Sequence, residues 1–352
     1  MLTRNPIRLA VIGAGLIGER HARQVASHPD FELAAIVDGN PDRRQLADEL
    51  GCLFRTSAKD IAPEICQAAI VATPNSDHLT SARICADNGW ACLMEKPIAD
   101  SVTDGEAICE MFETQKLPLL VGHHRRYHPF VGQAQRMLSD GSLGKPVFAS
   151  VIWAVRKPDD YFKQGAWRLN KDGGPLLINF IHEADLMLGL FGPVANVQAI
   201  ASNAQRGGPV EDSAAAIMRF ESGLLATVVL SDAALSPWSF EGASNENPNI
   251  AETGMSSWRI GCTQGSFDFP SLQTWQDAEG GLGDWSRPLK QSLPETERVD
   301  PLMEQLTHFA ECIRNPSTIP KVSDRDGLNA LALVQAVQQS AEQLLPVGFA
   351  AS

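Results

Sequence analysis

The chain has 352 residues, of which 44% are hydrophobic and 20% charged, and its formal net charge is −13. This composition is typical of a soluble globular protein, and the length suits two domains better than one core. The negative charge argues against a nucleic-acid groove or an anionic membrane surface as partner. The seven cysteines are dispersed, with no C-x-x-C pair, as expected for buried thiols in a reducing cytosol. No apolar run approaches the roughly 20 residues that span a bilayer, and the first strand begins too early for a signal peptide, so we expect a cytoplasmic protein.

A glycine fingerprint of the form G-x-G-x-x-G occupies residues 13–18, between an apolar run with strand composition and a predicted helix from Leu16 to Ala26. A second predicted strand, Leu33 to Val37, ends in Asp38 about twenty residues past the last glycine. Strand, glycine turn, helix, strand and acid together predict a dinucleotide-binding fold, with the pyrophosphate at the helix N-terminus. The cofactor contacts predicted in this region are Gly13, Gly15, Leu16, Ile17, Gly18 and Asp38.

Asp38 also bears on the choice of cofactor. A carboxylate at this position accepts hydrogen bonds from ribose hydroxyls and repels a 2′-phosphate, which favours NAD over NADP. Arg43 and Arg44 follow it closely and could hold a phosphate instead, or could be solvated residues in the first turns of a helix opened by Pro41. We therefore expect NAD, with NADP as the alternative, and Arg43 as a further cofactor contact.

Strand-like and helix-like segments alternate through about the first 122 residues, which predicts a doubly wound parallel sheet covered by helices on both faces. After the Asp38 strand, the predicted helices are Asp42 to Leu50, Asp77 to Asn88 and Thr103 to Gln115, and the predicted strands are Gln67 to Ala72, Trp90 to Met94 and Pro118 to Val121.

The pattern changes after Gly122, where consecutive strands predict an α+β domain with a large, mostly antiparallel open sheet. The predicted strands are Val147 to Ala154, Val194 to Ser202, Ala214 to Phe220, Leu224 to Leu230 and Trp258 to Gly261. The predicted helices are Leu176 to Phe191, Leu302 to Arg314 and Gly327 to Leu345, and residues 231–254 are predicted to be a loop. We thus predict an α/β protein with a Rossmann domain at residues 1–122, a substrate-binding and oligomerisation domain at residues 123–352, and a cleft between them.

Three further motifs carry a resemblance to a known family. Residues 72–78 read A-T-P-N-S-D-H, residues 95–97 read E-K-P, and residues 173–185 read G-G-P-L-L-I-N-F-I-H-E-A-D. Together with the fingerprint, they resemble the glucose–fructose oxidoreductase, inositol dehydrogenase and rhizopine-catabolism (Gfo/Idh/MocA) family over essentially the whole chain. The resemblance implies an NAD(P)-dependent oxidoreductase of sugars, polyols or inositols, commonly a dimer or tetramer. The cofactor contacts that it implies are Thr73, Pro74, Asn75, His78, Glu95 and Lys96.

Lys96 and His182 are the candidate catalytic residues. Lys96 follows a parallel strand at the end where open α/β sheets bind ligands, and its ammonium could hydrogen-bond a substrate oxygen and share the proton transfer. A neutral His182 imidazole can take a proton near pH 7, and Asp185, three residues on, could orient the ring. Without the family resemblance, a surface lysine and a structural histidine would be the simpler readings. Glu95 either holds the cofactor's ribose region or braces the turn.

The chain departs from the family pattern four residues before His182, where the family has an aspartate and this sequence has Ile178. The next residue, Asn179, shares roughly the same face of the predicted helix as His182 and could bind a substrate hydroxyl, but it cannot act as a carboxylate base. This departure leaves three interpretations open: the substrate differs, Lys96 and His182 alone relay the proton, or the protein has no dehydrogenase activity.

Other candidate substrate contacts lie in two polar stretches. Residues 122–129 contain three histidines and two arginines, of which His124 and Arg126 are the preferred contacts to hydroxyls or a carboxylate. Trp167 and Arg168 precede the Gly173–Gly174 turn, where an aromatic ring could pack on a sugar. We expect no metal site. The alternative activities are imine or pyrrole reduction, redox-assisted glycoside cleavage, and a non-catalytic NAD sensor.

Overall fold

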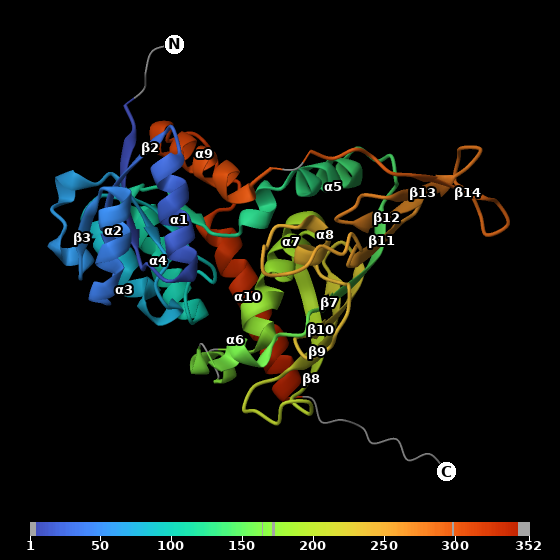
Figure 1. Cartoon of the computed structure of the whole chain (residues 1–352). Coiled ribbons are helices and arrows are strands. Elements are labelled where there is room, and N and C mark those ends of the chain that lie inside the picture. The colour runs from blue at the N-terminus through green and yellow to red at the C-terminus, as the bar shows by residue number, and fades with distance from the viewer. Residues whose placement is uncertain (1–4, 164, 171–172, 298, 344–352) are drawn as a thin grey trace. The chain divides into compact units, whose positions relative to one another are not determined.

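The computed structural model describes residues 5–163, 165–170, 173–297 and 299–343 (Figure 1). It divides into two compact units, each discontinuous in sequence. One comprises Met1–His128 and Val299–Leu331, and the other Pro129–Arg298 and Ala332–Ser352. Within the described residues, no helix is both long enough and apolar enough to cross a bilayer.

The first unit contains a six-stranded parallel sheet in the order β3-β2-β1-β4-β5-β6. Its strands are β1 (Ile7–Ile12), β2 (Phe31–Val37), β3 (Leu53–Arg55), β4 (Ala68–Val71), β5 (Ala91–Met94) and β6 (Leu119–Val121). Its helices are α1 (Leu16–Ser27), α2 (Arg44–Leu50), α3 (His78–Asp87), α4 (Val102–Gln115) and α9 (Pro301–Arg314). The strand order reverses between β1 and β4, so the crevice where doubly wound sheets bind ligands lies at the carboxyl ends of these two strands. The predicted Rossmann sheet is confirmed.

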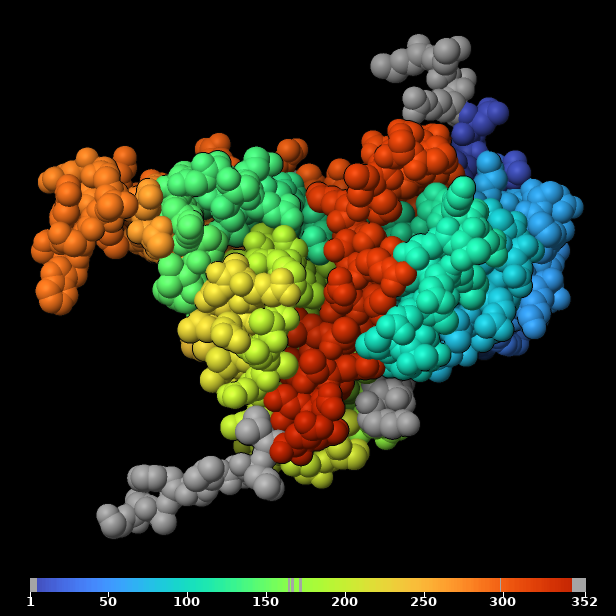
Figure 2. All heavy atoms as spheres, turned by 180° about the vertical axis from the view of Figure 1, so that it is seen from behind, coloured from blue at the N-terminus to red at the C-terminus, as the bar shows by residue number. Residues whose placement is uncertain are grey.

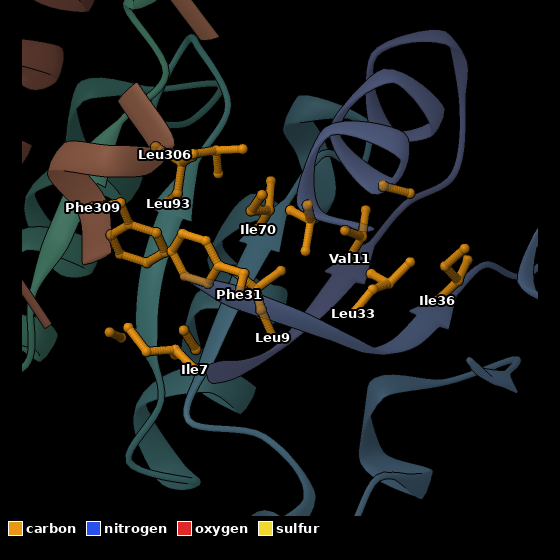
Figure 3. Close-up of a cluster of buried hydrophobic side chains, with 14 of the residues drawn as sticks. Ile7, Leu9, Val11, Phe31, Leu33, Ile36, Ile70, Leu93, Leu306 and Phe309 are labelled. Atoms are coloured by element: carbon orange, nitrogen blue, oxygen red, sulfur yellow. The ribbon is translucent and has the colours of Figure 1, made fainter. Parts of the chain in front are cut away.

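One face of this sheet packs against helices from both ends of the chain. Val11, Ile70 and Leu93 of the sheet belong to one buried cluster with residues of α1, α2 and α9 (Figure 3). The ring of Phe309 on α9 stacks on Phe31, with centroids 6.1 Å apart. The sequence-based division at residue 122 assigns α9 to the second domain, whereas the structure places it in the first unit, because its apolar face completes this core.

The second unit is built on an eight-stranded sheet in the order β14-β13-β12-β11-β7-β10-β9-β8. All neighbours are antiparallel except β7 and β10, so the prediction of a mostly antiparallel open sheet is confirmed. The strands are β7 (Pro146–Ala154), β8 (Val194–Ser202), β9 (Ser213–Phe220), β10 (Leu225–Ser231), β11 (Trp258–Cys262), β12 (Gly265–Phe269), β13 (Thr274–Asp277) and β14 (Leu289–Ser292). Its helices are α5 (Pro129–Ser139), α6 (Asp159–Lys163), α7 (Ile181–Phe191) and α8 (Phe240–Ser244), and the boundary between the units falls within α10 (Asp324–Gln343).

Two surfaces of the second unit carry exposed apolar side chains. β13 and β14 form a hairpin that projects from the rest of this unit and is orange in Figure 2, with Trp285 fully exposed between the strands. Strands β9 and β10 alternate buried and exposed residues, as expected for a sheet with one covered face, whereas β8 at the edge is mostly exposed. The exposed apolar residues on these strands and on β7 are Val147, Phe148, Ile200, Ile217, Leu225 and Val229.

The structure differs from the predicted elements in several places. The helix predicted over Leu176 to Phe191 begins with a π-helical turn, Leu176–Phe180, before α7. The predicted loop over residues 231–254 contains the short helix α8, and the end of the predicted last helix, beyond residue 343, lies outside the described residues. The elements that were not predicted are β3, β12, β13, β14, α5 and α6.

Candidate active site

The glycine loop after β1 is packed so tightly that two of its glycines are required by the protein itself. Gly13 has φ +90°, and a Cβ there would lie 2.5 Å from the carbonyl oxygen of Ala72 at the end of β4. A Cβ on Gly18 would lie 1.8 Å from the Gly13 carbonyl oxygen. At Gly15, by contrast, a Cβ would meet no atom of the described residues within 4 Å. Space beside Gly15 is what a pyrophosphate approaching the backbone needs.

The end of β2 holds Asp38 against this loop. Its Oδ2 accepts a hydrogen bond from the Ala14 N–H at 2.7 Å, and its Oδ1 accepts one from the Asn40 N–H at 2.8 Å. Each carboxylate oxygen retains a further lone pair, which a ribose hydroxyl can use. Leu16 and Ile17 follow in the first turn of α1, where helical geometry leaves the N–H groups without an intrahelical acceptor. The carboxylate, the open glycine and the free helix terminus fit a dinucleotide.

Both arginines that follow Asp38 have partners inside the first unit. The Arg43 guanidinium lies 3.4 Å from Glu19 Oε2, and both side chains are partly exposed. The Arg44 guanidinium lies over the Phe54 ring, 4.9 Å from its centroid. Both guanidinium groups thus contact protein side chains.

The loop after β4 supplies a buried hydroxyl and a buried imidazole. Thr73 Oγ1 is shielded from solvent and has no hydrogen-bond partner among the described residues. His78 is fully buried, with one ring nitrogen 3.2 Å from the Thr73 carbonyl oxygen and the other 3.2 Å from that of Ile98. Burial lowers the pKa of His78, so the neutral ring donates to one of these carbonyls and connects the loops after β4 and β5. Pro74 and Asn75 begin the short turn between Thr73 and His78. That these four residues contact the cofactor stays a prediction.

The Glu95–Lys96–Pro97 turn follows β5, and the Lys96–Pro97 peptide bond is cis. The buried Glu95 carboxylate lies 2.7 Å from His21 Nε2 on α1 and accepts the Lys96 N–H at 3.2 Å. Burial alone would raise the pKa of Glu95, but the hydrogen bond and charge of His21, together with nearby Lys96 and His124, lower it to about 2. Glu95 is therefore a buried carboxylate that fixes the backbone of the candidate catalytic lysine.

The polar stretch after β6, up to His128, belongs to the first unit. Burial and the charge of Arg125 lower the pKa of His124 to about 3, so this ring is neutral at physiological pH. Arg126 is buried and lies 3.6 Å from Asp326 Oδ1 at the start of α10. A substrate that contacts Arg126 would therefore share the guanidinium with the Asp326 carboxylate.

In the second unit, α7 carries the other catalytic candidate. His182 and Asp185 lie about one turn apart and are both buried. Between them, Glu183 is fully buried, and its Oε2 accepts a hydrogen bond from Trp258 Nε1 at 2.7 Å. This bond ties α7 to β11 and fixes the helix that presents His182.

The π-helical turn before α7 positions Asn179. Its start is fixed by Glu211, whose Oε1 accepts the Leu176 N–H at 2.9 Å, next to Gly174 at φ +80°. Asn179 Oδ1 accepts a hydrogen bond from Lys157 Nζ at 2.7 Å. Asn179 thus lies on a π turn, which is wider than an α turn, and His182 on α7; that the two share one face stays a prediction.

Of the two candidate substrate contacts before the Gly173–Gly174 turn, only Arg168 has a described side chain. Its guanidinium lies over the Tyr161 ring, 3.9 Å from the centroid. The side chain of Trp167 lies outside the described residues.

Sequence reasoning missed His21, Lys157 and Glu183. His21 is three residues past the fingerprint, and a histidine on a helix gives no sign of a buried partner 74 residues away. Lys157 lies in a charged, Pro-containing stretch that indicates an exposed loop. Only the apolar residues around Glu183 could have indicated that this acid is buried.

Comparison with known protein families identifies both parts of the chain. The family described as "Oxidoreductase family, NAD-binding Rossmann fold" matches residues 7–123, and the "GFO/IDH/MocA C-terminal domain" matches residues 131–268. The chain belongs to the GFO/IDH/MocA family. The predicted family, NAD as the cofactor and an oxidoreductase of the dehydrogenase type are thereby confirmed.

Individual relatives of this family member align over nearly its whole length. D-apiose dehydrogenase of Paraburkholderia graminis is 25% identical, with 95% of this chain and 87% of the relative aligned. The NAD-dependent scyllo-inositol 2-dehydrogenase of Bacillus subtilis is 27% identical, with 97% and 96% aligned. The WlbA dehydrogenase of Bordetella pertussis, solved with NADH and UDP-GlcNAcA, has the same fold, with a TM-score of 0.76, 22% identity, and 98% and 100% of the two chains covered. Among the described residues, no group of three or more His, Cys, Asp or Glu side chains could hold a metal ion.

Proposed function

We propose that this family member oxidises a secondary alcohol of a sugar, polyol or cyclitol with NAD. The observation that carries the proposal is the Glu95–Lys96–Pro97 turn, which holds Lys96 at the carboxyl edge of a sheet that bears a complete dinucleotide fingerprint. The names of the two relatives above, dehydrogenases of D-apiose and of scyllo-inositol, support this class of substrate.

Oxidation of a secondary alcohol removes a hydride and a proton. NAD, when bound, supplies the hydride acceptor. In the proposal, the Lys96 ammonium donates a hydrogen bond to the alcohol oxygen and stabilises the negative charge that develops there. The neutral His182 imidazole takes the proton, and Asp185 orients the imidazole ring. The proposed contacts to the remaining substrate oxygens are Asn179, His124, Arg126 and Arg168.

The proposal includes a preference for NAD over NADP. Asp38 would place a negative charge where NADP has its 2′-phosphate. Arg43 and Arg44, the nearest cations along the chain, already contact Glu19 and Phe54. The other proposed cofactor contacts are those of the glycine loop and of the loops after β4 and β5.

A panel assay tests this function. NADH absorbance is followed with NAD or NADP against inositols, aldoses, sugar acids and polyols. Lys96→Met is expected to lower kcat at least 100-fold while NADH binding is retained, because the lost charge acts on the reacting oxygen. Lys59→Met, an exposed lysine in the same unit, serves as the matched control.

Two results would count against the proposal. Normal turnover by Lys96→Met at saturating NAD would remove Lys96 from the catalytic role. Purified protein that retains NAD and oxidises no compound of the panel would instead point to redox-assisted cleavage or to a sensor.

A further inference from the structure

A buried charged cluster in the second unit has no part in the chemistry proposed so far. Its centre is Lys157, which follows β7 and whose side chain is only 10% exposed. The Lys157 ammonium lies 2.7 Å from Asn179 Oδ1 and 3.3 Å from Asp232 Oδ2, and the Asp232 side chain is 1% exposed. Burying a lysine charge is unfavourable unless partners compensate for the lost hydration, so a lysine this deeply buried indicates a specific role.

Backbone hydrogen bonds fix the position of Lys157. β7 and β10 run parallel, and after both strands end the Lys157 N–H donates to the Asp232 carbonyl oxygen at 2.9 Å. The second oxygen of the Asp232 carboxylate pairs with the Arg206 guanidinium. The loop that carries Arg206 is itself fixed, because the buried Asp212 carboxylate accepts the N–H groups of Gln205 and Arg206 at 2.9 and 3.0 Å. The Asp232 carboxylate that pairs with the Lys157 ammonium is therefore itself held in place.

Aromatic rings cover other sides of the Lys157 ammonium. The Tyr161 centroid lies 4.9 Å away and the Trp153 centroid 5.8 Å away, both within cation–π range. Trp153 is in turn anchored, since its Nε1 donates to Glu241 Oε2 at 2.9 Å. These contacts hold the ammonium at a fixed distance from Asn179.

The chemistry of an ammonium decides which way the Asn179 amide faces. Lysine has three donors and no acceptor, so the atom of Asn179 that faces it must be the oxygen. The amide nitrogen, with two N–H donors, is then directed away from Lys157. The ammonium also draws electron density through the amide, which makes these N–H groups stronger donors.

We propose that Lys157 is a positioning residue that fixes Asn179 as a hydrogen-bond donor, so that the substrate presents an acceptor oxygen, best a carboxylate, to Asn179. This inference rests on the proposed function in one respect, which is that Asn179 contacts the substrate. It predicts a preference for sugar acids over the matched neutral sugars.

The first experiment needs no turnover. Burial lowers the pKa of Lys157 to about 8, against the opposing charge of Asp232. Among the described residues, the other ionisable or charged groups near it include Arg206, Glu211, Glu241 and Tyr161. In protein labelled with ¹⁵N-asparagine, the Nδ2 signals of Asn179, assigned by their loss in Asn179→Asp, are expected to shift with a midpoint near pH 8. Lys157→Met should abolish this shift, and Lys163→Met, an exposed lysine of the same unit, should not.

The second experiment compares D-glucuronate with D-glucose, and D-galacturonate with D-galactose, as substrates. The wild type is expected to favour each acid by about tenfold in kcat/KM. Lys157→Met should lose this preference through KM with kcat little changed, Lys157→Arg should keep it, and Asn179→Asp should reverse it.

Each failure has a different meaning. An Nδ2 signal without a pH midpoint, or an acid preference unchanged in Lys157→Met, overturns the inference. If none of these four probes is turned over, the panel assay still decides the proposed function, and calorimetric binding of the four probes decides the inference. Tighter binding of the acids that is lost in Lys157→Met supports it, and equal binding overturns it.

Discussion

At the residue scale, the first unit depends on one buried ion-pairing contact. Glu95 is buried, and His21 is the side chain that contributes most to lowering its pKa against burial, ahead of Lys96 and His124. Removing one partner of such a pair leaves an uncompensated charge in the interior, which costs about 3–5 kcal/mol. The pair therefore couples the stability of α1 to the geometry of Lys96.

His21→Leu tests this coupling. We expect the free energy of unfolding to fall by about 3–5 kcal/mol at pH 7, measured by chemical denaturation. The Glu95 pKa is lower in the folded protein than its ordinary value of 4.5, so the stabilisation is complete above about pH 4.5 and is lost as pH falls towards 2. The gap between variant and wild type should therefore shrink over that range.

A second substitution distinguishes charge from packing. Glu95→Gln in the His21→Leu background removes the buried charge and should recover part of the lost stability. If the double variant is no more stable than His21→Leu, the loss came from packing, and the ion-pair account is wrong.

Asp38→Ser tests cofactor choice. The substitution removes the charge that repels a 2′-phosphate and weakens the clamp on the Ala14 N–H. The KM for NAD should rise at least tenfold, and the ratio of kcat/KM for NADP to that for NAD should rise by a similar factor, measured by NAD(P)H absorbance. Asp42→Ser, on the same loop, should leave both values unchanged.

At the element scale, the sequence predicted most of the strands and helices that carry the site. Apolar runs bounded by turn residues gave β1, β2, β4 and β5, because these strands are buried on both faces. Strand β14 was not predicted because all four of its residues are exposed, so its sequence has no hydrophobic pattern. The π turn was not predicted because its apolar spacing matches an α-helix, and Glu211, which fixes its start, lies 35 residues away from Leu176.

Gly174→Ala tests what holds that turn. Gly174 has φ +80°, and an added Cβ would lie 2.5 Å from Glu211 Oε1. We expect a loss of about 1–3 kcal/mol in stability together with a raised KM for substrate, because Asn179 lies on the turn that Glu211 fixes. Gly223→Ala, at φ +88° with no described atom within 4 Å of its added Cβ, should lower stability by less and leave KM unchanged. Equal effects on KM would show that the turn does not position Asn179.

At the scale of the whole molecule, one face of the second unit's sheet exposes several large apolar side chains. Ile200, at 65% exposure, and Ile217 lie on neighbouring strands, and Leu225 pairs directly with Phe148. Apolar side chains gathered on one sheet face are typical of an interface. We expect a homo-oligomer in which this face is covered by a second copy.

Ile217→Glu combined with Val229→Glu should convert that oligomer to monomers, measured by sedimentation velocity. A charge on each of two paired strands would have to be desolvated in the interface, which weakens association by several kcal/mol. Leu282→Glu, on the separate β13–β14 hairpin, is the control. An oligomer that survives both substitutions would place the interface elsewhere.

The amphipathic pattern of α9 predicted a helix but could not predict which core it joins, because periodicity carries no information about long-range partners. The consequence concerns synthesis. The ribosome releases β1 to β6 early in synthesis. Phe31 and its neighbours can complete their core only when Leu306 and Phe309 emerge, some 275 residues later. During that interval the part of this apolar face that α9 covers stays exposed on the nascent Rossmann sheet, so we expect chaperones to bind there until α9 emerges.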